Sequence, residues 1–91
     1  MIRAVFTHRR VTLTGHAGYA PRGQDIVCAA ASALVYALIA ALQEQDNLRE
    51  AVVRPGHVTV AANEGAEAEF SLVRGGLGQL AARYPDCVKV E

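Results

Sequence analysis

One histidine and one cysteine, separated by a short loop, are the side chains in this sequence best suited to chemistry. His16 closes an alternating segment, and Cys28 opens a long apolar one. A cysteine attacks as its thiolate, and its free pKa near ~8.5 falls to roughly 3.5–7.5 at a helix N-terminus or beside a cationic histidine. A nearby imidazole can take the thiol proton and later return it to a leaving amine. The pair therefore predicts nucleophilic attack on a carbonyl group.

Asp25, three residues before Cys28, has two candidate roles. As the N-cap of a helix it would accept bonds from backbone N–H groups and leave Cys28 in the first turn, at the positive end of the helix dipole. The unpaired N–H groups of that turn could then bind the oxyanion that forms when a carbonyl is attacked. As a third catalytic group, Asp25 would instead orient the imidazole of His16. Direct contact with the sulfur fits neither role, because a carboxylate there would oppose thiolate formation.

Further candidates lie around this pair. Ser32 stands one turn beyond Cys28 on the same helix face, where its hydroxyl would either steady the Cys28 turn or bond its own helix backbone. The loop before the helix contains Tyr19, Arg22 and Gly23. Tyr19 and Arg22 are candidate substrate contacts, against the simpler interpretations of a loop filler and a solvated charge. Gly23 relaxes the backbone, so we expect a loop that moves.

Hydrophobic periodicity predicts the elements that position these residues. Alternation at residues 2–7 and 11–14 predicts the two strands of an N-terminal β-hairpin, with residues 8–10 as its turn. Residues 17–24 contain two glycines and a proline, which favours a loop. The apolar run that follows predicts a helix over about residues 25–46.

The rest of the chain predicts a second set of strands and a second helix. Residues 48–50 are interpreted as a connector, and residues 51–53 and 57–61 as strands around a Pro-Gly turn. Apolar residues at helical spacing between 66 and 84 predict a helix, and residues 87–90 predict a closing strand. The order is then ββαββαβ. It indicates one small α+β domain over the whole chain, with two helices packed on a β-sheet.

The first predicted helix is apolar nearly all round, so it must be covered on more than one side. We expect layers on both of its faces or a second copy of the chain, and we expect Tyr36 in the core. The apolar run at residues 26–42 is shorter than the about twenty residues of a membrane-spanning helix, which favours a buried core helix. In the second helix, Gly75, Gly76 and Gly78 predict close helix packing. A phosphate-binding loop is disfavoured because the Lys-Ser or Lys-Thr pair is missing.

Composition limits the remaining possibilities. The formal net charge of the 91 residues is zero, which is not typical of a nucleic-acid-binding protein. A hydrophobic fraction of 52% permits a core without metal or disulfide bonds. Two cysteines, Cys28 and Cys87, are too few for a disulfide scaffold, and the chain opens on Met1 without a signal-peptide pattern. We therefore expect a cytoplasmic protein that needs no cofactor, binds no nucleic acid directly and does not enter a membrane.

The central stretch resembles the signature of the ribosomal-processing cysteine protease family, Prp. That family carries Gly-His-Ala, a loop, and then Gly-x-Asp-Ile-Val-Cys-Ala-Ala-x-Ser-Ala, a pattern that matches residues 15–17 and 23–33 here. The tail at residues 78–90, which runs from a helix through Tyr-Pro into a last strand, is also similar to the family's ending. The resemblance therefore spans nearly the whole chain.

This resemblance implies peptide-bond cleavage. Family members remove a short N-terminal extension from the twenty-seventh large-subunit ribosomal protein, cutting just after a pair of phenylalanines. His16 and Cys28 match the family's catalytic pair, and Gly15, Asp25 and Ser32 match positions that support it. The resemblance also implies a homodimer of a small α+β fold whose flexible loop closes on the substrate.

Two other interpretations stay open. A non-catalytic ribosome-assembly or peptide-binding module of the same fold would hold the extension without cutting it. A zinc site would combine His16 and Cys28 with His8, His57 or Cys87. The spacing matches no common zinc pattern, and catalytic zinc sites usually have three protein ligands. The leading prediction is therefore a cysteine endopeptidase without a metal.

Overall fold

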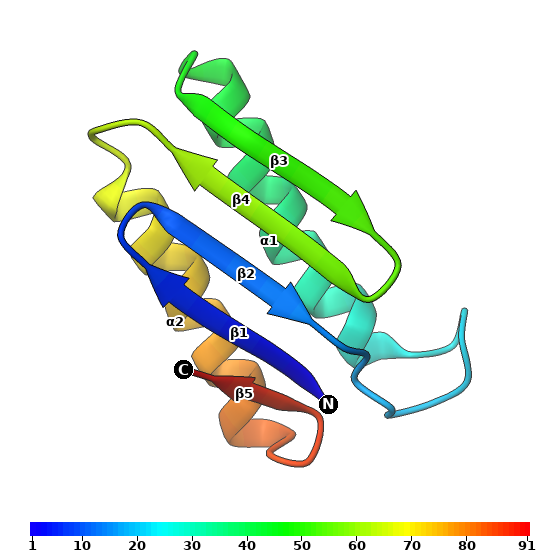
Figure 1. Ribbon diagram of the computed structural model, residues 1–91. Helices are drawn as coiled ribbons and strands as arrows, with labels where there is room; N and C mark the ends of the chain where they lie inside the picture. Colours follow the sequence, from blue (N-terminus) through cyan, green and yellow to red (C-terminus); the bar gives the residue numbers. More distant parts are fainter.

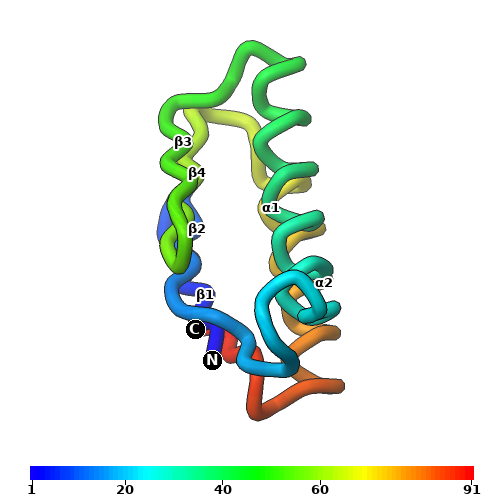
Figure 2. Tube along the Cα trace, turned by 90° about the vertical axis from the view of Figure 1, so that its right-hand side faces the viewer, coloured from blue at the N-terminus to red at the C-terminus, as the bar shows by residue number.

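The computed structural model describes all 91 residues, which form five strands and two helices. The strands make one sheet in the order β3-β4-β2-β1-β5 (Figure 1). Both helices lie on the same face of this sheet, and no helix covers its other face (Figure 2). The predicted α+β fold and the element order ββαββαβ are confirmed. The elements are β1 (Ile2–Thr7), β2 (Arg10–Thr14), α1 (Ile26–Glu44), β3 (Leu48–Arg54), β4 (His57–Ala62), α2 (Glu67–Arg83) and β5 (Val88–Val90).

The N-terminal hairpin has a shorter turn than the sequence predicts. β1 and β2 pair antiparallel, and Thr7 at the end of β1 lies opposite Arg10 at the start of β2. Arg10 is therefore part of the strand, and the turn contains only His8 and Arg9. Arg9, the second residue of this turn, has a φ of 58°, and a positive φ at that position is typical of a type II turn.

The register of the sheet brings the end of β2 next to the β3–β4 turn. β2 pairs antiparallel with β4, and Thr14 lies opposite His57. β3 and β4 form a second hairpin, in which Arg54 lies opposite His57 and the turn consists of Pro55 and Gly56. The residues that follow β2 therefore leave the sheet beside this turn.

β3 begins earlier than the sequence predicts. Leu48 already pairs with Ala62 and Glu50 with Ala61, so the predicted connector is part of the strand. Arg49 is an extra residue between these two pairs, which makes a β-bulge. A bulge shifts the side-chain alternation by one residue, and this shift hides the start of the strand from a periodicity analysis.

The core lies between the sheet and the helix layer. Strands with one covered face alternate inward apolar residues with outward ones, and β1 and β2 follow this pattern closely. β5 adds to the same layer by pairing parallel with β1. The largest fully buried side chains come from the sheet and from both helices: Leu38, Leu42, Leu77, Val11, Val27, Val60 and Val88.

α1 is a core helix that the sheet covers on one side and α2 along one flank. Five residues of it are buried, namely Val27, Ala31, Val35, Leu38 and Leu42. Its opposite side faces solvent, because no further layer of the chain lies beyond it (Figure 2). Tyr36 is 54% exposed, so its predicted place in the core is wrong. By length and mean hydropathy alone α1 could also cross a membrane, as core helices of this kind often could.

Only one of the three glycines in α2 serves helix packing. A Cβ at Gly76 would meet two methyl carbons of Leu34 in α1 at 2.9 Å, so the helices approach closely there. A Cβ at Gly75 or Gly78 would have no neighbour within 4 Å. The prediction of close packing is therefore wrong at these two positions, where nothing in the fold requires glycine.

Candidate active site

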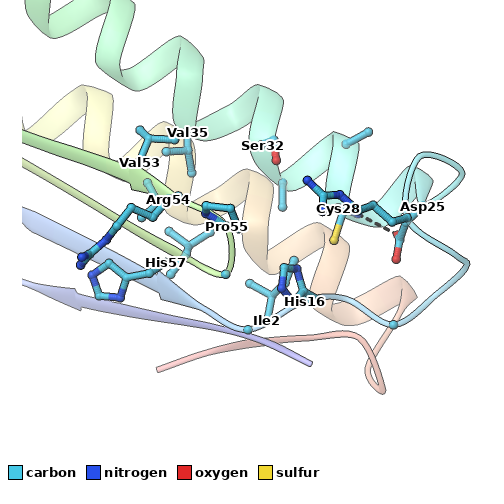
Figure 3. A pocket seen from close by; sticks show the side chains of 18 of the residues that line it. Ile2, His16, Asp25, Cys28, Ser32, Val35, Val53, Arg54, Pro55 and His57 are labelled. Carbon is cyan, nitrogen blue, oxygen red and sulfur yellow. Dashed lines mark hydrogen bonds between the residues drawn. The ribbon is translucent and has the colours of Figure 1, made fainter.

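Three segments meet around one cleft: the end of β2, the β3–β4 turn and the first turn of α1 (Figure 3). The cleft has a volume of about 840 Å³, and both His16 and Cys28 line it. In Figure 3 the sulfur of Cys28 points from α1 toward the segment that carries His16. The fold thus brings the imidazole and the thiol to one concave surface.

The residue before His16 fixes where the imidazole leaves the sheet. The N–H of Gly15 donates to the carbonyl oxygen of Gly56 at 3.0 Å, which extends the β2–β4 pairing by one residue. Gly15 has a φ of 88°, and a Cβ there would overlap the carbonyl oxygen of Met1. Only glycine fits both restrictions. The chain turns away from the sheet at this point, and His16 projects into the cleft as an exposed residue.

Cys28 lies in the first turn of α1 and is half-buried. The N–H of Ala17, a residue only 2% exposed, donates to its sulfur at 3.3 Å. A hydrogen bond to an ionised acceptor is stronger than one to its neutral form, and the N-terminus of a helix favours negative charge. The N–H of Ala17 and the N-terminus of α1 therefore both favour the thiolate form of Cys28.

Asp25 is the N-cap of α1, the first of its two predicted roles. One carboxylate oxygen accepts from the N–H groups of Val27 and Cys28 at 3.0 and 2.9 Å. The other accepts from the N–H groups of Tyr19 and Ala20 at 3.0 and 3.4 Å. All four donors are backbone groups, so this carboxylate does not bond the imidazole of the candidate pair. It caps the helix and ties the preceding loop to the cap.

These bonds lower the pKa of Asp25 below its ordinary value of 3.8, with the N–H of Cys28 as the largest cause and desolvation acting in the opposite direction. Asp25 is thus a carboxylate at neutral pH. The same bonds occupy the N–H groups of Val27 and Cys28, and the N–H of Ala29 donates to the Asp25 carbonyl at 3.1 Å. The prediction that the N–H groups of the first turn are free to bind an oxyanion is therefore wrong for Val27, Cys28 and Ala29, because Asp25 accepts from all three.

The other predicted site residues divide into two groups. Ser32, Arg22 and Gly23 line the cleft. Ser32 is exposed, and its hydroxyl makes neither of the two hydrogen bonds predicted for it. Tyr19 does not line the cleft. Its ring packs edge-on against Tyr84 at the end of α2, with centroids 5.4 Å apart and planes at 77°. Tyr19 therefore anchors the loop to the end of α2, and the residues that follow it, Ala20, Arg22 and Gly23, line the cleft.

The sequence did not reveal one wall of the cleft. Arg54, Pro55, Gly56 and His57 from the β3–β4 turn all line it. The Pro-Gly pair does predict a turn, but nothing in the sequence shows which other segment that turn lies beside. The pairing of β2 with β4 supplies that information.

No group of three His, Cys, Asp or Glu side chains is arranged to hold a metal ion. His8 lies in the β1–β2 turn, at the opposite end of β2 from His16. Cys28 and Cys87 are both free thiols. The arrangement that the structure does contain is a thiol, an imidazole and a capped helix start around a cleft.

Known proteins are similar to this chain in sequence. Residues 1–89 match the family model described as cysteine protease Prp. The ribosomal processing cysteine protease Prp of Mycoplasma pneumoniae is 47% identical over 36 residues, which is 40% of this chain and 36% of that protein. The matched stretch thus spans only about a third of the length of this curated relative.

Solved structures match over the entire chain. The ribosomal processing protease Prp from S. aureus, in complex with a covalently linked product peptide, has a TM-score of 0.83 at 21% identity, over 99% of this chain and 95% of that one. The protein SMU.848 from Streptococcus mutans has a TM-score of 0.81 at 30% identity, over 100% of this chain and 92% of that one. Because the family model covers residues 1–89, the chain belongs to the cysteine protease Prp family.

Proposed function

We propose that this protein is a cysteine endopeptidase that removes the N-terminal extension of a large-subunit ribosomal protein, with Cys28 as nucleophile and His16 as general base. The observation that carries the proposal is a half-buried thiol in the first turn of a helix that shares a cleft with an exposed imidazole. Membership of the Prp family supports the reaction class. The name of the M. pneumoniae relative supports the ribosomal substrate.

The reaction follows from the roles of the two groups. His16 takes the thiol proton, and the Cys28 thiolate attacks the scissile carbonyl carbon, forming a C–S bond while the carbonyl electrons move to oxygen. Collapse of this intermediate breaks the C–N bond, and the imidazolium gives its proton to the leaving amine. Water then attacks the thioester while His16 takes its proton. The C–S bond breaks, the peptide acid is released, and His16 returns the proton to the sulfur.

The lining of the cleft supports an apolar substrate segment. Val53, Val58 and Tyr36 contribute accessible apolar surface to it, and the nearly buried Ile2, Leu13 and Val35 also border it. Ligand clefts are usually apolar with a few polar groups that fix orientation. This chemistry suits the pair of phenylalanines that the family resemblance implies on the acyl side of the cut. A second structure of the S. aureus protease is in complex with a substrate peptide, which supports a peptide ligand for this fold.

Substitution of the nucleophile tests the proposal directly. We expect Cys28→Ser to abolish cleavage of a synthetic peptide that spans the ribosomal extension, measured by mass spectrometry of the products. Cys87→Ser is the matched control, because Cys87 is the other free thiol and lies outside the cleft. Full activity of Cys28→Ser, or equal loss in both variants, would contradict the assignment.

A peptide-binding module that does not cut is the second candidate. The observation that favours it is the occupation of the N–H groups of Val27 and Cys28 by Asp25, which removes them as oxyanion donors. Alkylation separates the two functions. In a binder, Cys28 would react with iodoacetamide at neutral pH like an ordinary thiol, whereas a catalytic thiolate would react much faster and depend on His16.

We further propose that the protein works in the cytoplasm as a homodimer. Two free thiols and no disulfide bond are typical of a reducing compartment. The solvent-facing side of α1 is rich in alanine and carries the exposed Tyr36. A second copy packed on this side would supply the cover that the chain itself lacks.

A further inference from the structure

The β3–β4 turn touches His16 without offering it a side chain. A Cβ on Gly56 would lie 3.1 Å from Nε2, 3.6 Å from Cε1 and 3.8 Å from Cδ2 of the imidazole. These three atoms form one edge of the ring, so this edge packs over the bare glycine. Ordinary contact between heavy atoms is about 3.5–4.0 Å. Any side chain at Gly56 would therefore push the imidazole by a few tenths of an ångström.

Gly56 also holds the backbone that leads to the histidine. Its carbonyl oxygen accepts the N–H of Gly15 at 3.0 Å, one residue before His16. Its φ of 72° belongs to the left-handed region, which the tight turn between β3 and β4 uses. The same glycine thus affects His16 in two ways: it bonds the residue before it, and it leaves free the space beside the ring that a Cβ would fill.

We propose that Gly56 is a positioning residue for His16, which decides where the imidazole lies in the cleft that it shares with Cys28. This inference rests on the proposed role of His16 as general base. His16 is exposed, so its ring has few other neighbours, and a side chain at Gly56 would be the group that moves it. Glycine is required at position 56 because a larger residue there would displace the imidazole of His16, even if the β3–β4 turn kept its shape.

A matched pair of glycine substitutions separates ring displacement from backbone strain. Gly56→Ala adds the Cβ that meets His16. Gly65→Ala adds a Cβ at a φ of 85° in the turn between β4 and α2, with nothing within 4 Å of it. Both variants carry similar left-handed strain, and only the first touches the imidazole.

We expect Gly56→Ala to lower kcat for the extension peptide about tenfold relative to Gly65→Ala, with KM unchanged. A misplacement of about 1 Å at a reacting group costs on the order of 100-fold, and the shift here is smaller. Gly56→Asn repeats the measurement with a residue that tolerates a left-handed backbone, in case Gly56→Ala does not fold. Equal kcat values at positions 56 and 65 would overturn the proposal.

A double-mutant cycle tests whether Gly56 acts through the imidazole. The rate of Cys28 alkylation by iodoacetamide is measured at pH 7 and located by mass spectrometry, so that Cys87 is scored separately. Gly56→Ala alone should slow this rate, and it should cause no further slowing in a His16→Ala background. Additional slowing in that background would refute the positioning role.

The two readouts also distinguish this inference from the proposed function. If the wild-type protein cuts no peptide but its Cys28 alkylation depends on His16 and on Gly56 in one coupled way, the peptidase assignment fails and the positioning role stands. If the peptide is cut and Gly56→Ala behaves like Gly65→Ala in both assays, the positioning role fails and the peptidase assignment stands.

Discussion

At the scale of single residues, Asp25 connects the loop to the turn that carries the nucleophile. One oxygen of its carboxylate accepts from Cys28 and the other from Tyr19 and Ala20. The loop and the start of α1 cannot separate without breaking these bonds. Hydrogen bonds from N–H groups to an ionised carboxylate are stronger than those to a neutral acceptor. Both the charge of Asp25 and the geometry of its hydrogen bonds should therefore stabilise the loop and the first turn of α1.

We expect Asp25→Asn to destabilise the protein at pH 7 and to matter less in acid. The pKa of Asp25 is lowered below 3.8 in the folded protein, chiefly by the N–H of Cys28. Its contribution is therefore fully present above the pKa of the unfolded chain and is lost as pH falls through the lowered value. Asparagine keeps a capping oxygen without the charge.

Urea unfolding of wild type and Asp25→Asn across this range checks the prediction. The difference in unfolding free energy should shrink as the pH drops from 7 to below 3.8. Glu69 serves as a control position, because its pKa is also lowered, by a hydrogen bond from the side chain of Gln45 far from the loop. Glu69→Gln should show the same pH trend without changing Cys28 alkylation. A pH-independent difference for Asp25→Asn would contradict the charge argument.

Those parts of the site that depend on neighbouring residues could be predicted from the sequence. An N-cap at Asp25 and a first-turn position for Cys28 are local patterns, and both are present. The contact between Gly56 and His16 depends on which strands pair, and hydrophobic periodicity does not give strand order. The sequence predicts both an Asp25 cap and free N–H groups in the first turn. These two predictions compete, because the capping carboxylate accepts from the N–H groups of Val27 and Cys28 that an oxyanion would need.

At the scale of elements, α2 contains glycines that its packing does not explain. Gly76 faces Leu34 at close range, but Gly75 and Gly78 face open space. Glycine inside a helix costs about 0.5–1 kcal/mol relative to alanine. Gly75 and Gly78 therefore lower the stability of α2 without allowing any closer packing.

We expect Gly75→Ala and Gly78→Ala each to stabilise the protein by about 0.5–1 kcal/mol. Gly76→Ala should gain little, since its Cβ would lie 2.9 Å from the methyl carbons of Leu34 and the leucine must move. Urea denaturation of the three variants measures the difference. The prediction fails if Gly76→Ala is as stabilising as the other two.

The elements themselves could be predicted where their pattern is regular. The strands β1, β2 and β4 and the helix α2 follow clear periodicities, α1 is indicated by the length of its apolar run, and all are present. The bulge at Arg49 breaks the alternation of β3, so periodicity predicts a connector where the strand begins. In α1 almost every residue is apolar, so no periodic signal indicates that Tyr36 lies on the solvent side.

At the scale of the whole molecule, the two-layer fold leaves the outer side of its helices without a further layer (Figure 2). The sheet takes up one side of α1, and the residues on the other side remain accessible. Ile26 and Tyr36 on α1 are 57% and 54% exposed. Contiguous apolar surface on a soluble protein commonly marks a site of association. The exposed residues of α1 on this surface are Ile26, Ala29, Ala33, Tyr36, Ala37 and Ala40.

If a second copy of the chain covers this surface, a charge placed there should separate the two. We expect wild type to sediment at twice the 9.7 kDa of the chain and Ala37→Glu to sediment as a monomer. An unpaired charge buried in an interface costs about 3 kcal/mol, and because the dimer would contain one from each copy, dimerisation should weaken by more than about 100-fold. Ala68→Glu is the matched control, because Ala68 is exposed in the first turn of α2, where a carboxylate suits the helix dipole. Both glutamates fit an exposed helix, so each variant should keep the fold, as circular dichroism would verify.

Analytical ultracentrifugation over a range of concentrations decides the outcome. Dissociation of Ala37→Glu alone assigns the dimer interface to α1. A monomeric wild type would contradict the dimer, and a dimeric Ala37→Glu would show that the interface does not include this side of α1.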